Sequence, residues 1–138
     1  PPVGLGNGTS LKTVLYSETS PIGVSTRGLA HGAPTEILIQ DAAEVLSTII
    51  DQARAKGLKV AVKMDCEGSE FPIFESLIAK DVLQNINIFL IEWHKWWSSD
   101  KTQADLIAPL LEHDFVILDH TDASNPHAGR LYAIRTEA

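Results

Sequence analysis

Acidic side chains and a histidine follow two apolar stretches of the sequence. The first stretch, Val60–Met64, is followed by Asp65, Glu67 and Glu70, and the second, Ile88–Ile91, is followed by Glu92 and His94. Apolar runs of this length predict strands that are buried on both faces of a parallel sheet. Ligands of open α/β sheets bind outside the carboxyl ends of such strands. We therefore expect these acids and the histidine to gather at one edge of one sheet and to form a site.

The residue types at this edge suit acid–base chemistry. His94 is the best candidate for a general base, because an unperturbed imidazole titrates near pH ~6.5. Its spacing from Glu92 turns both side chains to the same side of a strand, so the pair could act as base and orienter. Glu67 and Glu70 flank Gly68, for which we expect a positive φ or a close backbone approach. Acids this close must share a proton, bind a cation or face water.

The sequence leaves a cation open as one alternative for these acids, since carboxylate oxygens suit Mg²⁺ or Ca²⁺. The alternative for Glu70 is that it begins a helix and favours the positive end of the helix dipole. The other histidines are scattered without metal-ligand spacing: His31, His113, His120 and His127. We therefore assign no metal site from the sequence.

Composition limits the possible partners and the compartment. The chain has 138 residues, 44% apolar and 21% charged, which is typical of one globular domain spanning residues 1–138. A net charge of −7 argues against a nucleic-acid partner. No apolar run approaches the ~18 residues of a membrane helix, and no signal peptide is recognisable. The single cysteine, Cys66, cannot form an internal disulfide, so we expect a cytoplasmic protein.

Alternating strand and helix patterns predict an α/β fold. The predicted strands are Ser10–Ser17, Thr35–Gln40, Leu58–Met64, Asn87–Glu92, Phe115–Leu118 and Gly129–Arg135. The predicted helices run from an N-cap at Asp41 to Gly57, over Glu70–Ala79 and over Lys101–His113. Residues 1–8 predict a loop or frayed terminus, and Pro21–Pro34 a long connection. Pro109 predicts a kink or an earlier start of the last helix. We expect one mostly parallel sheet with an antiparallel edge.

Three segments of the sequence resemble the FkbM-type methyltransferases: Lys63–Glu70, Phe74–Leu77 and Leu90–His94. In that family a strand ending in Lys-apolar-Asp-apolar-Glu-Gly-small-Glu precedes a helix, and a second strand ends in Glu-x-His. The resemblance covers roughly residues 9–135. It implies a class I methyltransferase fold, which is Rossmann-like, and the use of S-adenosylmethionine. The implied reaction is methyl transfer to a hydroxyl oxygen of a small-molecule acceptor such as a sugar or natural product.

The resemblance also implies catalytic roles. It places Asp65 beside the methyl group of the donor, as a cofactor-binding and catalytic residue, with the other site residues on the acceptor side. His94 would remove the hydroxyl proton, and Glu67 or Glu92 would orient the reacting groups. The alternative for Asp65 is that it caps the helix after Gly68.

Acceptor binding would involve Glu70 and the tryptophans that follow the second apolar stretch. Trp96 and Trp97 could wall a pocket and stack on a sugar or aromatic ring. Trp93 is expected to pack in the core, and the outer pair could instead form a lid or a dimer contact. Cys66 lies between two acids, so we expect a raised thiol pKa and a small buried residue rather than a nucleophile.

One departure from the family separates two hypotheses. The family holds its donor with an N-terminal half that includes a Gly-rich strand–turn–helix, whereas Gly4–Gly8 is followed by a strand pattern. The chain thus resembles the C-terminal portion of such an enzyme, truncated at the N-terminus. The rival hypothesis is a non-catalytic remnant or interaction module. An exposed sheet edge would then pair with a partner or form a homodimer.

Overall fold

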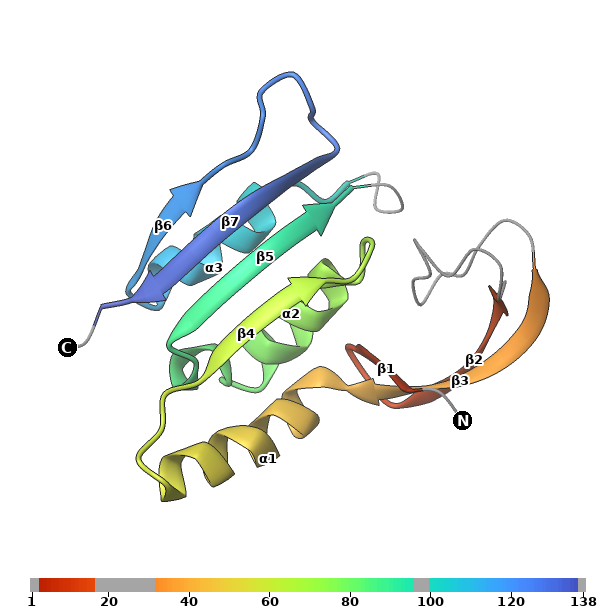
Figure 1. Ribbon diagram of the computed structural model, residues 1–138, viewed down its shortest axis with the longest axis horizontal. Coiled ribbons are helices and arrows are strands. Elements are labelled where there is room, and N and C mark those ends of the chain that lie inside the picture. The colour runs from red at the N-terminus through yellow and green to blue at the C-terminus, as the bar shows by residue number, and fades with distance from the viewer. Residues whose placement is uncertain (1–2, 17–31, 96–99, 137–138) are drawn as a thin grey trace.

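The computed structural model describes residues 3–16, 32–95 and 100–136 and arranges them as two sheets with helices (Figure 1). The elements in chain order are β1 Val3–Gly6, β2 Ser10–Tyr16, β3 Ala33–Asp41, α1 Ala42–Ala55, β4 Ala61–Asp65, α2 Glu70–Ala79, η1 Leu83–Asn85, β5 Ile88–His94, α3 Ala104–Glu112, β6 Phe115–Asp119 and β7 Ala128–Arg135. Within these residues, no helix has the length and apolar character to cross a membrane. The α/β class predicted from the sequence is confirmed.

The larger sheet carries the predicted site and has the strand order β4-β5-β7-β6. Strands β4 and β5 are parallel, and Asp65 is the register partner of Glu92. Strand β7 is antiparallel to both β5 and β6. The smaller sheet adds a third antiparallel contact, because β2 runs against β3. The expectation of one mostly parallel sheet is therefore wrong: the described residues form two mixed sheets.

Helices α2 and α3 lie against one face of the larger sheet (Figure 1). The core between these helices and the sheet contains a series of tilted aromatic contacts. The ring centroids are 5.3 Å apart for Phe74–Phe89 and 5.7 Å apart for Phe89–Phe115. The opposite face is open to solvent, and Leu90 on it is 39% exposed. The apolar run of β5 therefore alternates between buried and exposed positions. The prediction that these strands are buried on both faces is wrong.

The smaller sheet has the order β1-β3-β2 and contains residues predicted as a loop. Strand β1 pairs parallel to β3, with Val3 opposite Leu38. Gly6 allows this approach, because a Cβ there would lie 2.9 Å from Cγ2 of Ile39. The frayed terminus predicted for residues 1–8 is therefore wrong for residues 3–6. Ala33 and Pro34 belong to β3, whereas the rest of the predicted connection lies largely outside the described residues.

The start of α1 confirms the cap predicted from the sequence. The backbone N–H of Glu44 donates to Oδ1 of Asp41 at 3.1 Å. The Ser76 hydroxyl of α2 donates to the same oxygen at 2.9 Å and accepts from the N–H of Ala43 at 3.1 Å. Lys80, at the end of α2, lies 3.2 Å from Asp41 Oδ1. The cap therefore also joins the two helices.

Helix α3 begins later than the sequence predicted. The N–H of Thr102 donates to a carboxylate oxygen of Asp105 at 2.7 Å, and the Thr102 hydroxyl donates to the same oxygen. These bonds hold Thr102 in a turn ahead of the first helical residue, Ala104. Pro109 lies inside the helix without ending it. An earlier start of this helix is therefore wrong.

Candidate active site

Three of the predicted site residues meet where β4 and β5 end. Asp65 and Glu67 each have a carboxylate oxygen, and His94 a ring nitrogen, that lie within 4.8 Å of one another. Strand β4 ends at Asp65 and strand β5 ends at His94, so the parallel pairing brings the two carboxyl ends together. His94 is only 8% exposed, whereas Asp65 faces solvent. The cluster thus joins an exposed and a half-buried carboxylate to a buried imidazole.

The turn between β4 and α2 is held by Glu70, which is fully buried. The backbone N–H of Cys66 donates to Glu70 Oε1 at 2.6 Å, and that of Gly68 donates to Oε2 at 2.8 Å. Gly68 has φ 91°, as expected, and Glu67 has φ 50°. A left-handed conformation is unusual for a residue with a side chain, so the two bonds to Glu70 help to maintain it.

Glu70 also orients the imidazole of the cluster. Its Oε1 lies 3.4 Å from Nδ1 of His94. Glu92, which was expected to orient this histidine, contacts Arg130 instead, with Nη2 3.3 Å from its Oε1. The predicted Glu92–His94 pair is therefore replaced by a Glu70–His94 pair. Since Ser69 is the N-cap residue of α2, Asp65 does not cap that helix.

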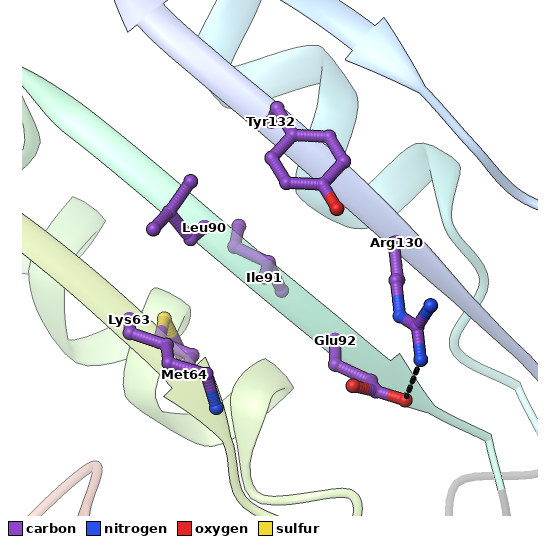
Figure 2. Close-up of a pocket in the computed structure, with 7 residues that line it drawn as sticks. All are labelled: Lys63, Met64, Leu90, Ile91, Glu92, Arg130 and Tyr132. Carbon is purple, nitrogen blue, oxygen red and sulfur yellow. Dashed lines mark hydrogen bonds and ion pairs between the residues drawn. The ribbon is translucent and has the colours of Figure 1, made fainter.

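Glu92 and Arg130 lie in a groove of about 160 Å³ on the open face of the sheet (Figure 2). The groove is lined by Lys63, Met64, Leu90, Ile91, Glu92, Arg130 and Tyr132. The hydrogen bond to Glu92 raises the pKa of Arg130. Arg130 and Tyr132 were not predicted from the sequence. The alternation of side chains along β7, which turns residues 130 and 132 to the same face, is the signal that could have found them.

The open face also carries an ion pair beside the cluster. The ammonium of Lys63 lies 3.5 Å from Oδ2 of Asp65, and the Lys63 side chain is 68% exposed. An ion pair this exposed contributes little to stability and is easily displaced. Asp65 can therefore exchange this contact for a ligand.

The remaining predicted residues have different outcomes. Trp93 is 2% exposed and packs in the core, as expected. Trp96 and Trp97 lie outside the described residues, so their predicted contact with an acceptor stays a prediction. Burial raises the pKa of the Cys66 thiol, and the charges of Glu70 and Asp65 add to this rise. The direction agrees with the expectation, but burial contributes more than the neighbouring acids.

These features define an α/β protein with carboxylates and a buried histidine at the ends of adjacent parallel strands. Comparison with protein families gives a match to the methyltransferase FkbM domain over residues 3–117. The chain therefore belongs to the FkbM methyltransferase domain family, which confirms the resemblance of its motifs. No curated protein and no solved structure matches the sequence.

Proposed function

We propose that this chain supports methyl transfer from S-adenosylmethionine to a hydroxyl oxygen of a small molecule. The family match supports a methyltransferase in general. The observation that carries the finer proposal is the cluster in which Asp65, Glu67 and His94 approach within 4.8 Å. It combines groups that favour a cationic donor with a group that accepts a proton. A sugar or natural product with free hydroxyls is the proposed acceptor.

The carboxylates of the cluster fit the charge of the donor. S-adenosylmethionine supplies a methyl group on a positively charged sulfonium and carries an amine, and both charges favour nearby carboxylates. Asp65 is the accessible acid at the end of β4, so we assign it to the donor side. Its ion pair with Lys63 is exposed and easily exchanged. Glu67 lies next to it in the turn and faces the same space.

His94 is the proposed base for the acceptor hydroxyl. Forming the new carbon–oxygen bond requires that the hydroxyl lose its proton, and a positioned base typically contributes about 10²–10⁴-fold to the rate. Nδ1 of His94 faces Glu70, which fixes the orientation of the ring. That contact makes Nε2 the nitrogen that would take the proton. Glu70 is thus a positioning residue in this proposal, although its predicted role in acceptor binding stays open to test.

Calorimetric titration of the purified chain with S-adenosylmethionine and its demethylated product tests donor binding. We expect micromolar binding that Asp65→Asn weakens by at least about tenfold, because the isosteric amide lacks the charge. Glu112→Gln changes an exposed acid far from the cluster in sequence and serves as the matched control. No heat at millimolar donor would contradict the proposal that this chain alone binds the donor.

A single-turnover assay with hydroxylated acceptors then separates binding from chemistry. We expect His94→Gln to retain donor affinity within about threefold and to lower the transfer rate by about 10²-fold or more. Circular dichroism of this variant checks that the buried substitution leaves the fold intact. Unchanged transfer in folded His94→Gln would remove the histidine from the proposed mechanism.

A second candidate function is an interaction module. The open face of the larger sheet exposes several large apolar side chains: Leu90, Val116, Leu118, Tyr132 and Ile134. Exposed apolar patches of this kind are typical of surfaces that contact another chain. Strand β4 also forms an edge of its sheet within the described residues. Sedimentation velocity over a hundredfold concentration range tests for the homodimer that this candidate predicts.

A further inference from the structure

We propose that Asp65, Glu67 and His94 form a binding site for one divalent transition-metal cation. The inference concerns the same residues as the proposed transferase site, and it rests on the proposed function only where it assigns a catalytic role to the cation. The binding itself can be measured without donor or acceptor. The site would take a cation such as Mn²⁺ or Zn²⁺, which accept a mixture of carboxylate and imidazole ligands.

The spacing of the ligand atoms is close to that of a coordinated cation. Ligand atoms at about 2.1 Å from a common ion lie roughly 3 to 4 Å from one another. The atoms of Asp65, Glu67 and His94 lie within 4.8 Å of one another. Rotation of the two carboxylates, which are less buried than the histidine, can close the remaining gap.

The histidine is held as metal-binding histidines usually are. Ligating imidazoles commonly present the second ring nitrogen to a carboxylate, which fixes the ring and increases its basicity. In this protein Nδ1 of His94 faces Oε1 of Glu70 at 3.4 Å. Glu70 is fully buried and accepts hydrogen bonds from Cys66 and Gly68, so it cannot turn toward the cluster without breaking them. The arrangement therefore assigns Nε2 of His94 to the cation and excludes Glu70 as a ligand.

Charge also favours a divalent ion. Asp65 and Glu67 contribute two negative charges and a neutral imidazole contributes none, so one divalent cation neutralises the ligand set. The nearest cation to Asp65 recorded in the described residues is Lys63, whose side chain is 68% exposed. A bound divalent ion would displace this weak ion pair and gain a stronger attraction to both carboxylates.

The proposal gives His94 a role other than that of a base. One nitrogen cannot bind a cation and accept a proton at the same time. Three protein ligands leave coordination positions open, as in catalytic metal sites. An acceptor hydroxyl in such a position would have a lowered pKa and would lose its proton to solvent more easily. Metal binding and a metal-free base are therefore alternative uses of His94.

Titration of the metal-free chain with Mn²⁺, followed by electron paramagnetic resonance, tests the site. We expect one bound Mn²⁺ per chain, and we expect Asp65→Asn and Glu67→Gln each to weaken binding by at least about tenfold. Asp65 is exposed and Glu67 is half-buried, and both substitutions keep the size of the side chain, so the fold should tolerate them. Glu92→Gln removes the acid next to Asp65 in the sheet register and should change the affinity by less than about threefold.

Electron spin echo envelope modulation of the bound Mn²⁺ tests whether His94 is the third ligand. We expect modulation from a directly bound imidazole nitrogen in the unmodified chain and its loss in His94→Gln. The unmodified chain gives this signal whether or not the variant folds. Zn²⁺ should displace Mn²⁺ at lower concentration than Mg²⁺ does, because imidazole favours zinc.

Three results would overturn the proposal. The first is the absence of bound Mn²⁺ at millimolar concentration. The second is binding that Asp65→Asn and Glu67→Gln leave unchanged, and the third is a bound ion without nitrogen modulation. A chain that binds Mn²⁺ as expected but shows no heat with S-adenosylmethionine would retain the metal site while the donor proposal fails. A chain that gives heat with S-adenosylmethionine but binds no Mn²⁺ would retain the donor proposal and contradict the metal site.

Discussion

Substitution of Glu70 should destabilise the protein more than substitution of any exposed acid. The carboxylate of Glu70 is fully buried and accepts hydrogen bonds from the N–H groups of Cys66 and Gly68 at 2.6 and 2.8 Å. In Glu70→Ala both donors lose their partner at the start of α2. Glu70→Gln retains one acceptor oxygen but turns an amide N–H₂ toward a backbone donor. We therefore expect Glu70→Ala to lose more stability than Glu70→Gln.

The structure gives a magnitude for this loss. An N–H group left buried without a partner costs about 1–3 kcal/mol, so two such groups cost about 2–6 kcal/mol. Removing the carboxylate also relieves the free energy of holding a charge away from water, which offsets part of this loss. We expect a net decrease of about 3 kcal/mol in the free energy of unfolding for Glu70→Ala. A decrease of this size is a large fraction of the 5–15 kcal/mol typical of a domain.

Urea unfolding followed by circular dichroism measures this decrease. With a slope of about 2 kcal/mol/M, a loss of 3 kcal/mol lowers the midpoint by about 1.5 M. Glu112→Ala is the matched control, because Glu112 is an exposed acid in α3 and should change stability by less than about 0.5 kcal/mol. Amide exchange at Cys66 and Gly68 should accelerate in Glu70→Ala and stay unchanged in the control.

A small effect of Glu70→Ala would contradict this expectation. A loss below about 1 kcal/mol in Glu70→Ala would mean that water replaces the carboxylate at both N–H groups. Equal losses in Glu70→Ala and Glu112→Ala would mean that the hydrogen bonds do not contribute. A large loss without faster amide exchange at Cys66 and Gly68 would locate the effect elsewhere.

Further predictions concern the cap, a close contact and the core. Burial raises the pKa of Asp41, but hydrogen bonds and the nearby ammonium lower it by more, so the net pKa lies below its usual value. The charged form of Asp41 therefore stabilises the fold above about pH 4, and this contribution is lost as pH falls through the native pKa. The free energy of unfolding of Asp41→Asn should therefore depend less on pH between about 2 and 5 than that of the unmodified chain. Gly129→Ala should cost about 1–3 kcal/mol by thermal unfolding, because its Cβ would lie 2.8 Å from Cβ of Thr121, whereas Gly8→Ala, with nothing within 4 Å, is the control. Phe89→Ala should cost about 3–5 kcal/mol in urea, because its fully buried ring contacts aromatic rings on both sides; a loss below about 1 kcal/mol would mean that the core collapses around the cavity.

Local signals in the sequence predicted local structure well. Asp41 with Glu44 three residues later predicted the cap of α1, and the observed N–H bond from Glu44 confirms it. The apolar stripe after Glu70 gave α2 with the bounds that the structure has. The apolar run before Asp65 and Glu67 predicted a strand that ends at these acids, and β4 ends at Asp65; the function of the two acids stays a prediction. Each of these features depends on residues a few positions apart, which the sequence displays directly.

Features that depend on tertiary pairing could not be read in the same way. The run in β5 is apolar at both alternating sets of positions, so the sequence does not reveal that Leu90 faces solvent. The pairing of β1 with β3 places Val3 opposite Leu38, and no local pattern predicts a parallel contact between residues so far apart in the sequence. For the same reason, the sequence did not reveal that Glu70, rather than Glu92, is the partner of His94. Only Glu92 was paired with His94 by its spacing, and in the structure Arg130 on β7 takes the contact of Glu92 while Glu70 faces the imidazole.

The spacing of the Asp-x-Glu-Gly-x-Glu segment acquires a physical reason from the contacts of Glu70. Asp65 ends β4 and Glu70 begins α2, so the intervening turn must reverse the chain within a few residues. Gly68 and Glu67 allow the reversal through positive φ, and the last acid binds back to the N–H groups of residues 66 and 68. The same carboxylate faces His94 on the neighbouring strand. One buried acid thus holds both the turn that carries Glu67 and the imidazole opposite it. An inserted residue in the turn would separate Glu70 from one of these partners, and the cluster would then open even if every member remained present.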